Sequence, residues 1–136
     1  MEDNIVYVSH PISGYDIQKM KEYESQLKPK LEAQFPGAYI FMPLLELNGP
    51  NSKYTEYWEL MKECLGVVYK CNNFVLCPEW IKSNGCRDEF YVACNQSKRI
   101  YYLDKSDNIF EMPIGIIEKN LMITANKALN KQKQDN

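Results

Sequence analysis

The chain has 136 residues, of which 45% are hydrophobic and 25% are charged, and its formal net charge is -2. This composition is typical of one globular domain, and the small acidic balance provides no basic stripe for nucleic acid. No apolar run reaches membrane-spanning length, and the acidic start of the chain is unlike a signal peptide. We therefore expect a cytoplasmic protein that binds neither nucleic acid nor membranes.

The cysteine and histidine content argues against a metal site. The five cysteines are odd in number, form no Cys-x-x-Cys pair, and are accompanied by one histidine, His10. Zinc sites of the usual spacing need more closely grouped ligands. Most of the cysteines lie in apolar surroundings and are predicted to be small buried side chains kept reduced. We expect neither a metal nor a cofactor.

The first third of the chain predicts a strand, a helix and a second strand. Residues 5–9 are β-rich, and the Pro/Gly/Ser-containing turn at 10–14 ends the strand. Apolar residues at helical spacing then follow, namely Ile17, Met20, Leu27 and Leu31. Pro29 is expected to kink this helix or end it early. The second strand is predicted at 38–42.

Strands and helices continue to alternate to the end of the chain. A loop is predicted at 43–53, a helix at 54–69, strands at 73–77 and 99–103, a helix at 86–97, an edge strand at 109–112 and a helix at 116–129. The alternation predicts an α/β fold with a mainly parallel sheet of four to five strands. We expect a single domain over residues 1–130, followed by a polar, frayed tail at 131–136.

The segment after the strand at 73–77 has the features of a ligand site. Ser83 and Gly85 precede a helix whose first turn is expected to carry Glu89. In open parallel sheets, ligands bind beyond the carboxyl ends of the strands, and helix starts suit phosphate or carboxylate groups. The helix dipole would keep Glu89 ionised, as a nucleophile requires. The alternative is structural, because Ser-x-Gly is also a common helix cap.

Two motifs resemble one known superfamily. Residues 7–14, Tyr-Val-Ser-His-Pro-Ile-Ser-Gly, are similar to the first signature of the nucleoside 2-deoxyribosyltransferase-like superfamily. Residues 78–89 resemble the second signature of a small branch that is frequent in phages and prophages and is related to 2′-deoxynucleoside 5′-phosphate N-hydrolases. The resemblance covers roughly residues 4–103. It implies a flavodoxin-like or Rossmann-like three-layer sandwich, cleavage of an N-glycosidic bond, and a homodimer or higher oligomer.

The resemblance also implies roles for individual residues. Glu89 matches the glutamate that attacks the anomeric carbon, and Tyr7 matches the tyrosine that positions the sugar and that glutamate. Ser83 stands where relatives that hydrolyse 5′-monophosphates carry a serine and nucleoside transferases carry an aspartate. A monophosphate is therefore the expected ligand. Its expected contacts are hydroxyl groups, glycines and one guanidinium, from Ser9, Ser13, Gly14, Ser83, Gly85 and Arg87.

Two positions depart from the pattern of the superfamily. Cys64 replaces an aspartate that helps handle the base, which leaves Glu79, Asp88 or the loop at 43–53 as the alternatives for protonating the leaving base. His10 replaces a glycine, and it is predicted either to contact the phosphate or base or to serve as a cap or surface residue. The sequence thus leaves two main functions open, beside a purely structural or interaction role. One is a nucleotide N-glycosidase or transferase, and the other is an inactive module that binds the same nucleotide.

Overall fold

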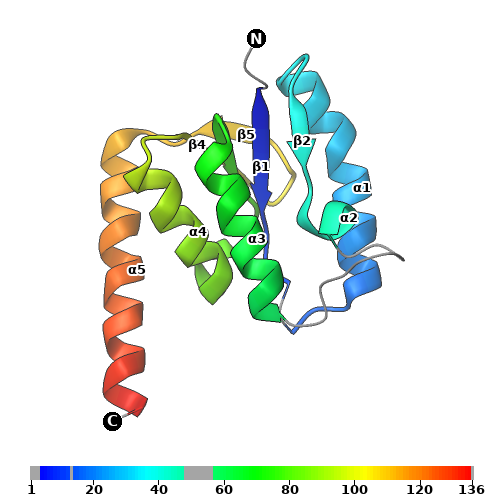
Figure 1. The fold of residues 1–136 in the computed structure, drawn as a ribbon. Helices are drawn as coiled ribbons and strands as arrows, with labels where there is room; N and C mark the ends of the chain where they lie inside the picture. The colour runs from blue at the N-terminus through cyan, green and yellow to red at the C-terminus, as the bar shows by residue number, and fades with distance from the viewer. Residues whose placement is uncertain (1–3, 13, 48–56, 136) are drawn as a thin grey trace.

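The computed structural model describes residues 4–12, 14–47 and 57–135. Strands and helices alternate through most of the chain (Figure 1). The elements are β1 (Ile5–Ser9), α1 (Ile17–Gln34), β2 (Tyr39–Phe41), α2 (Pro43–Leu47), α3 (Tyr57–Lys70), β3 (Asn73–Leu76), the 3-10 helix η1 (Trp80–Lys82), α4 (Asn84–Asn95), β4 (Arg99–Leu103), β5 (Ile109–Glu111) and α5 (Ile114–Asp135). None of the helices in these ranges is long and apolar enough to cross a membrane.

The sheet has five strands in the order β2-β1-β3-β4-β5. The first four are parallel, and β5 runs antiparallel to β4 at the edge. The prediction of an α/β fold with a mainly parallel sheet is therefore confirmed, as is the edge position of the last strand. From β1 the chain proceeds to β2 on one side and later to β3 on the other, so strand order reverses at β1. Such a reversal creates a crevice at the carboxyl ends of the two flanking strands.

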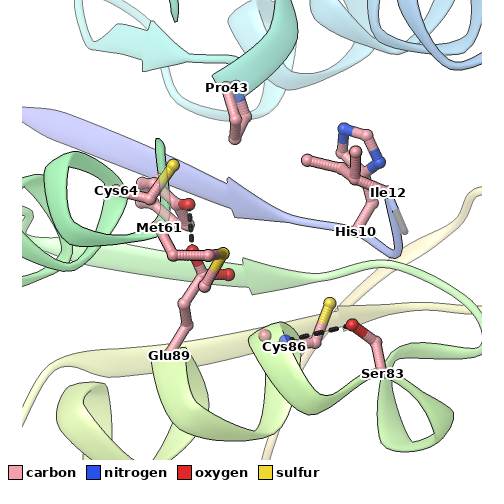
Figure 2. A pocket seen from close by; sticks show the side chains of 10 residues that line it. His10, Ile12, Pro43, Met61, Cys64, Ser83, Cys86 and Glu89 are labelled. Carbon is pink, nitrogen blue, oxygen red and sulfur yellow. Dashed lines mark hydrogen bonds between the residues drawn. The ribbon is translucent and has the colours of Figure 1, made fainter. Parts of the chain in front are cut away.

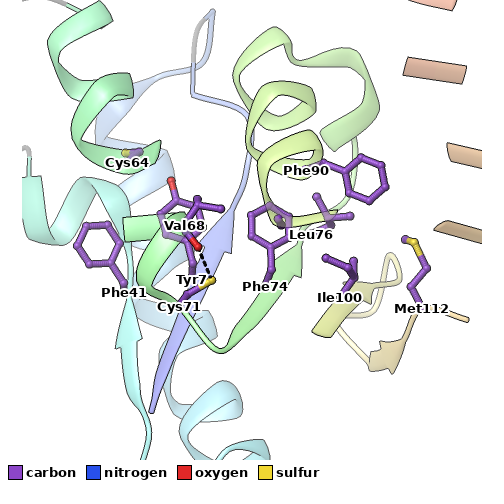
Figure 3. Close-up of a cluster of buried hydrophobic side chains, with 11 residues drawn as sticks. Tyr7, Phe41, Cys64, Val68, Cys71, Phe74, Leu76, Phe90, Ile100 and Met112 are labelled. Carbon is purple, nitrogen blue, oxygen red and sulfur yellow. Dashed lines mark hydrogen bonds between the residues drawn. The ribbon is translucent and has the colours of Figure 1, made fainter. Parts of the chain in front are cut away.

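The alternating side chains of each strand form two cores, one on each face of the sheet. On one face Tyr7, Phe74 and Leu76 pack with α3 and α4 (Figure 3). Tyr7 is stacked between Phe41 and Phe74, with ring centroids 5.6 and 5.8 Å apart. On the other face Val6, Val8, Val75 and Cys77 pack against Leu27 and Leu31 of α1. The sheet is thus the middle layer between helices.

Several element boundaries differ from those predicted, and three of the differences bear on the fold. Residues 43–47, predicted as loop, form α2, and the rest of that predicted loop lies outside the described residues. Helix α4 begins at Asn84 instead of residue 86, because Ser83 caps it. Helix α5 extends to Asp135, well past the predicted end at residue 129 and through most of the predicted tail.

Pro29 does not end α1, which continues to Gln34. A proline inside a helix removes one backbone hydrogen bond and crowds the carbonyl four residues earlier. Pro29 is exposed, so no packing is lost when its ring is removed. We expect Pro29→Ala to raise the free energy of unfolding by about 2 kcal/mol. Urea titration measures this, with the exposed Glu32→Ala on the same helix as the control; an unchanged midpoint would show that the helix already accommodates the proline.

Candidate functional site

The site is centred on the carboxylate of Glu89, which α4 places against the carboxyl end of β1. The Tyr7 hydroxyl donates a hydrogen bond to one carboxylate oxygen, and the Ser9 hydroxyl donates to the other at 2.7 Å. Tyr7 and Ser9 are two residues apart on β1, so their side chains point to the same face of the sheet. Glu89 is only 4% exposed. The strand therefore presents two hydroxyl groups to one buried carboxylate.

Burial raises the pKa of Glu89 from its ordinary value of 4.5 to about 7. The hydrogen bonds from Tyr7 and Ser9 and the nearby His10 oppose this rise in the pKa, because each favours the ionised carboxylate. The helix dipole does not favour ionisation of Glu89 in the way expected from the sequence. Since α4 begins at Asn84, Glu89 lies in the second turn, and the dipole acts within the first. The prediction that Glu89 lies in the first turn of the helix is wrong.

Removing the hydroxyl donors should raise the pKa of Glu89 further. We expect the pKa to increase in Tyr7→Phe and, by a smaller amount, in Ser9→Ala, because the ionised form loses a donor in each variant. A carbon-detected NMR titration of the glutamate carboxyl groups measures this directly. Tyr102→Phe, on β4, which is separated from β1 by β3, is the control. A Glu89 pKa that falls or stays constant in Tyr7→Phe would show that the hydroxyl does not stabilise the charge.

A pocket opens beside Glu89 at the carboxyl end of β1 (Figure 2). Its lining residues are Tyr7, His10, Ile12, Pro43, Met61, Cys64, Ser83, Gly85, Cys86 and Glu89. The space is about 10 Å³, which is enough for one water molecule. Met61 extends from α3 toward Glu89, and its unbranched side chain can change rotamer readily. In this conformation the space is too small for a nucleotide, so nucleotide binding would require side chains such as that of Met61 to move.

The structure places Ser83 and Gly85 at the pocket, as predicted, and it also confirms the structural interpretation of Ser83. The Ser83 hydroxyl oxygen accepts a hydrogen bond from the Cys86 amide at 3.2 Å and so caps α4. Ser83 and buried Gly85 both line the pocket. The start of a 12-residue helix therefore faces the space beside Glu89, and its positive end favours an anion there.

Arg87 and Gly14 are not among the residues that line the pocket. The Arg87 guanidinium donates to the Ile81 carbonyl oxygen at 2.7 Å and to the side-chain oxygen of Asn84. Arg87 therefore stabilises residues 81–84, which connect η1 to α4. Gly14 is exposed in the turn before α1, where its positive φ of 85° suits glycine. Ser13, predicted to contact a phosphate, lies outside the described residues.

His10 is neither a surface residue nor a donor aimed at a ligand. Its Nδ1 donates to the Pro11 carbonyl oxygen at 3.1 Å, and its Nε2 faces the carboxylate of Glu24. Both ring nitrogens face oxygen atoms of the protein within hydrogen-bond distance. His10 is 4% exposed and Glu24 is fully buried. Because both nitrogens are occupied, neither is available to a phosphate or base.

Glu24 is the important residue that the sequence interpretation missed. Its carboxylate also accepts hydrogen bonds from the amides of Leu44 at 3.1 Å and Leu45 at 2.9 Å, at the start of α2. It thereby joins α1, α2 and the turn after β1. One signal was available, because Glu24 falls on the same helix face as Leu27 and Leu31, where an apolar residue is expected.

All five cysteines are free thiols, and all but the partly buried Cys94 are buried. Cys64 lies near the Tyr7 ring (Figure 3), and burial together with the Glu89 charge raises the pKa of its thiol to about 12. It therefore stays protonated at neutral pH. Among the described residues, no group of three or more His, Cys, Asp or Glu side chains is placed to hold a metal ion.

The fold and the site define an α/β protein with a buried, hydroxyl-held glutamate at the carboxyl edge of a mainly parallel sheet. Residues 4–102 match the family model described as a domain of unknown function, DUF4406. The match covers well over half of the chain, so the protein belongs to the DUF4406 family. No curated protein matches the chain.

Proposed function

We propose that the protein cleaves the N-glycosidic bond of a nucleoside 5′-monophosphate, with Glu89 as the nucleophile. The observation that carries the proposal is the Glu89 carboxylate, buried at the strand ends and held by Tyr7 and Ser9. The motif resemblance supports the same roles for Glu89 and Tyr7. The observed strand order also matches the 2-1-3-4-5 order of flavodoxin-like sheets, apart from the antiparallel β5.

In the proposed reaction, an ionised Glu89 oxygen attacks the anomeric carbon as the bond to the base nitrogen breaks. The base leaves with the bonding electrons and takes a proton from water. Water then hydrolyses the glycosyl ester, or a second base replaces it in a transfer reaction. The Tyr7 and Ser9 hydroxyl groups keep Glu89 aligned through these steps. The start of α4, with Ser83 and Gly85, would receive the phosphate.

An inactive nucleotide-binding module is the alternative, and Cys64 is the observation that favours it. Cys64 lines the pocket where the superfamily carries an aspartate, and its raised thiol pKa makes it a poor acid at neutral pH. His10 has both ring nitrogens occupied. The described pocket therefore contains no side chain suited to protonate the leaving base. A binding module would use the same pocket without the bond cleavage.

The test is to incubate the purified protein with ribo- and deoxyribonucleoside 5′-monophosphates and to measure the released base by chromatography. The proposal expects release from at least one substrate, and loss of release in Glu89→Ala. Matched nucleosides without phosphate show whether the phosphate is required. A nucleotide that raises the melting temperature without base release would support the binding module instead.

The rate of base release should depend on pH through the ionisation of Glu89. Since only the carboxylate is nucleophilic, and its pKa is about 7, we expect kcat/KM to rise about tenfold per pH unit below pH 7 and to level off above it. Tyr7→Phe should move this rise to higher pH. A rate that is constant from pH 5 to pH 8 would exclude Glu89 as the titrating group.

Two broader expectations belong to this proposal. We propose a reducing, cytoplasmic setting, which the five free thiols support. We also propose a homodimer or higher oligomer, as the motif resemblance implies, and size-exclusion chromatography with light scattering tests it.

A further inference from the structure

A second cavity, of about 400 Å³, lies on the other side of the turn that follows β1. Its walls come from the first turns of α1 and from the segments that follow β1, β3 and β4. His10 borders both this cavity and the Glu89 pocket, and Glu89 does not border this one. Cys77, which lines the cavity, packs in the core on the α1 face of the sheet. The two spaces therefore open on opposite faces of the same sheet edge.

The position and size of this cavity are those of a small-molecule site. It lies at the carboxyl ends of neighbouring parallel strands, beside the point where strand order reverses. Cavities of about 300–1,000 Å³ are typical of ligand sites, whereas the space beside Glu89 is far smaller. The cavity has room for a ring system that the Glu89 pocket, in the same conformation, does not have.

The apolar walls of the cavity favour a flat ring. They include the rings of Tyr15 and Tyr23, together with Met20 and Pro78. Tyr15 is 48% exposed, so one of its ring faces is accessible to a ligand. Aromatic rings stack on other flat π-systems, and a methionine side chain adapts to the shape of what it contacts.

The polar walls present an acceptor and a donor to the same space. Asp107 accepts from the Tyr23 hydroxyl at 3.3 Å, a long hydrogen bond that uses only Oδ1. Within the described part of the chain, no other side chain donates to Asp107. Lys105 supplies an ammonium donor from the same β4–β5 turn. Glu79 is paired with Lys82 at 2.6 Å, which leaves Asp107 as the acceptor available to a ligand.

We propose that this second cavity binds a nucleobase-like heteroaromatic ring, such as the base of a nucleoside. Such a ring stacks on Tyr15, donates an amino hydrogen to Asp107 and accepts a hydrogen bond from Lys105. An aliphatic ligand lacks the flat face, and a simple sugar phosphate lacks both the ring and the amino donor. The site is separate from Glu89, so it does not depend on the proposed cleavage activity.

Binding is tested by titrating the full chain with adenosine and cytidine, and with ribose 5-phosphate as the compound without a base. Isothermal calorimetry gives the affinity, and amide chemical-shift changes locate the site. We use Glu89→Gln protein in parallel, so that substrate turnover does not confuse the measurement. Saturable binding with a Kd below about 1 mM for at least one nucleoside is expected, with little or no binding of ribose 5-phosphate.

Three variants then assign the site. Tyr15→Ala should weaken binding about tenfold, since it removes the stacking surface. Asp107→Asn should also weaken binding, and because asparagine tolerates the positive φ of 60° at this position, the turn is kept. Tyr91→Ala, an exposed tyrosine on α4, is the control and should bind as wild type does.

Two results would overturn the proposal. The first is the absence of saturable nucleoside binding in a protein whose circular dichroism and melting temperature are normal. The second is binding that Tyr15→Ala and Asp107→Asn leave intact while the shift changes map to Ser83 and Gly85, which would assign the nucleoside to the Glu89 pocket. Failure of the proposed cleavage reaction can be distinguished from failure of this binding proposal, because cleavage is measured by base release alone.

Discussion

Glu89→Gln is expected to lower base release by about a thousandfold and to stabilise the protein above pH 7. The amide keeps the size of the side chain and a carbonyl oxygen for one hydroxyl donor, but it has no nucleophilic carboxylate. The amide also cannot ionise, so the variant avoids the free-energy cost of a buried carboxylate charge in the folded protein. One substitution should therefore change activity and stability in opposite directions.

The pH dependence of this stabilisation follows from the raised pKa. In the unfolded chain Glu89 ionises near pH 4.5, whereas in the folded protein its pKa is about 7. Between these values the folded state holds more protons, so the free energy of unfolding falls as pH rises. Above pH 7 the folded protein carries the full free-energy cost of ionising the buried Glu89. The rise in its pKa from 4.5 to about 7 corresponds to a cost of about 3 kcal/mol.

Urea unfolding of wild type and Glu89→Gln at pH 5 and pH 8 measures the difference. We expect similar stabilities at pH 5, where the folded carboxyl group is mostly protonated, and a clear advantage for the variant at pH 8. Glu118→Gln, an exposed carboxylate on α5, is the matched control and should show no such trend. Equal stability of wild type and Glu89→Gln at both pH values would mean that Glu89 ionises in the folded protein as easily as in water.

Glu24→Ala is expected to lower the free energy of unfolding by about 3–5 kcal/mol. Glu24 is fully buried and accepts from the ring of His10 and from two backbone amides. Its removal leaves the Nε2 of His10 and the amides of Leu44 and Leu45 buried without their partner, and it also leaves a cavity.

Glu22→Ala, an exposed carboxylate on the same helix, should change stability by less than about 0.5 kcal/mol and is the control. Chemical denaturation at pH 7 compares the two variants. A loss below about 1 kcal/mol in Glu24→Ala would show that water replaces the carboxylate and that the pair with His10 contributes little.

The regular elements could be predicted because their patterns are local. The β-rich run at 5–9 and the strand at 99–103 were located correctly to the residue. Tyr7 and Glu89 meet as the motif resemblance indicated. Ser9 was expected to contact a phosphate, but it donates to Glu89 instead, because Ser9 and Tyr7 share one face of β1. The motif resemblance therefore located the contact between Tyr7 and Glu89, but not the partner of Ser9.

The remaining features depend on contacts between distant segments. Nothing local shows that Glu24 would meet His10 and the amides of α2, because burial of a charge is decided by the partners it finds. Arg87 was assigned to a phosphate on its charge, but it donates instead to an oxygen of Ile81 in η1 and one of Asn84 at the start of α4. The raised pKa of Glu89 reflects burial by surrounding layers, which a one-dimensional pattern does not report.

The two outermost strands of the sheet, β2 and β5, have three residues each, and Pro113 follows β5 closely. Short edges with a nearby proline offer few unpaired backbone groups to another chain. Continuation of the sheet from one molecule into the next is therefore disfavoured, which protects the folded protein from aggregation through its strands. Among the elements described, the helix surfaces are then better suited to self-association than the sheet edges, and substitutions on those surfaces should control it.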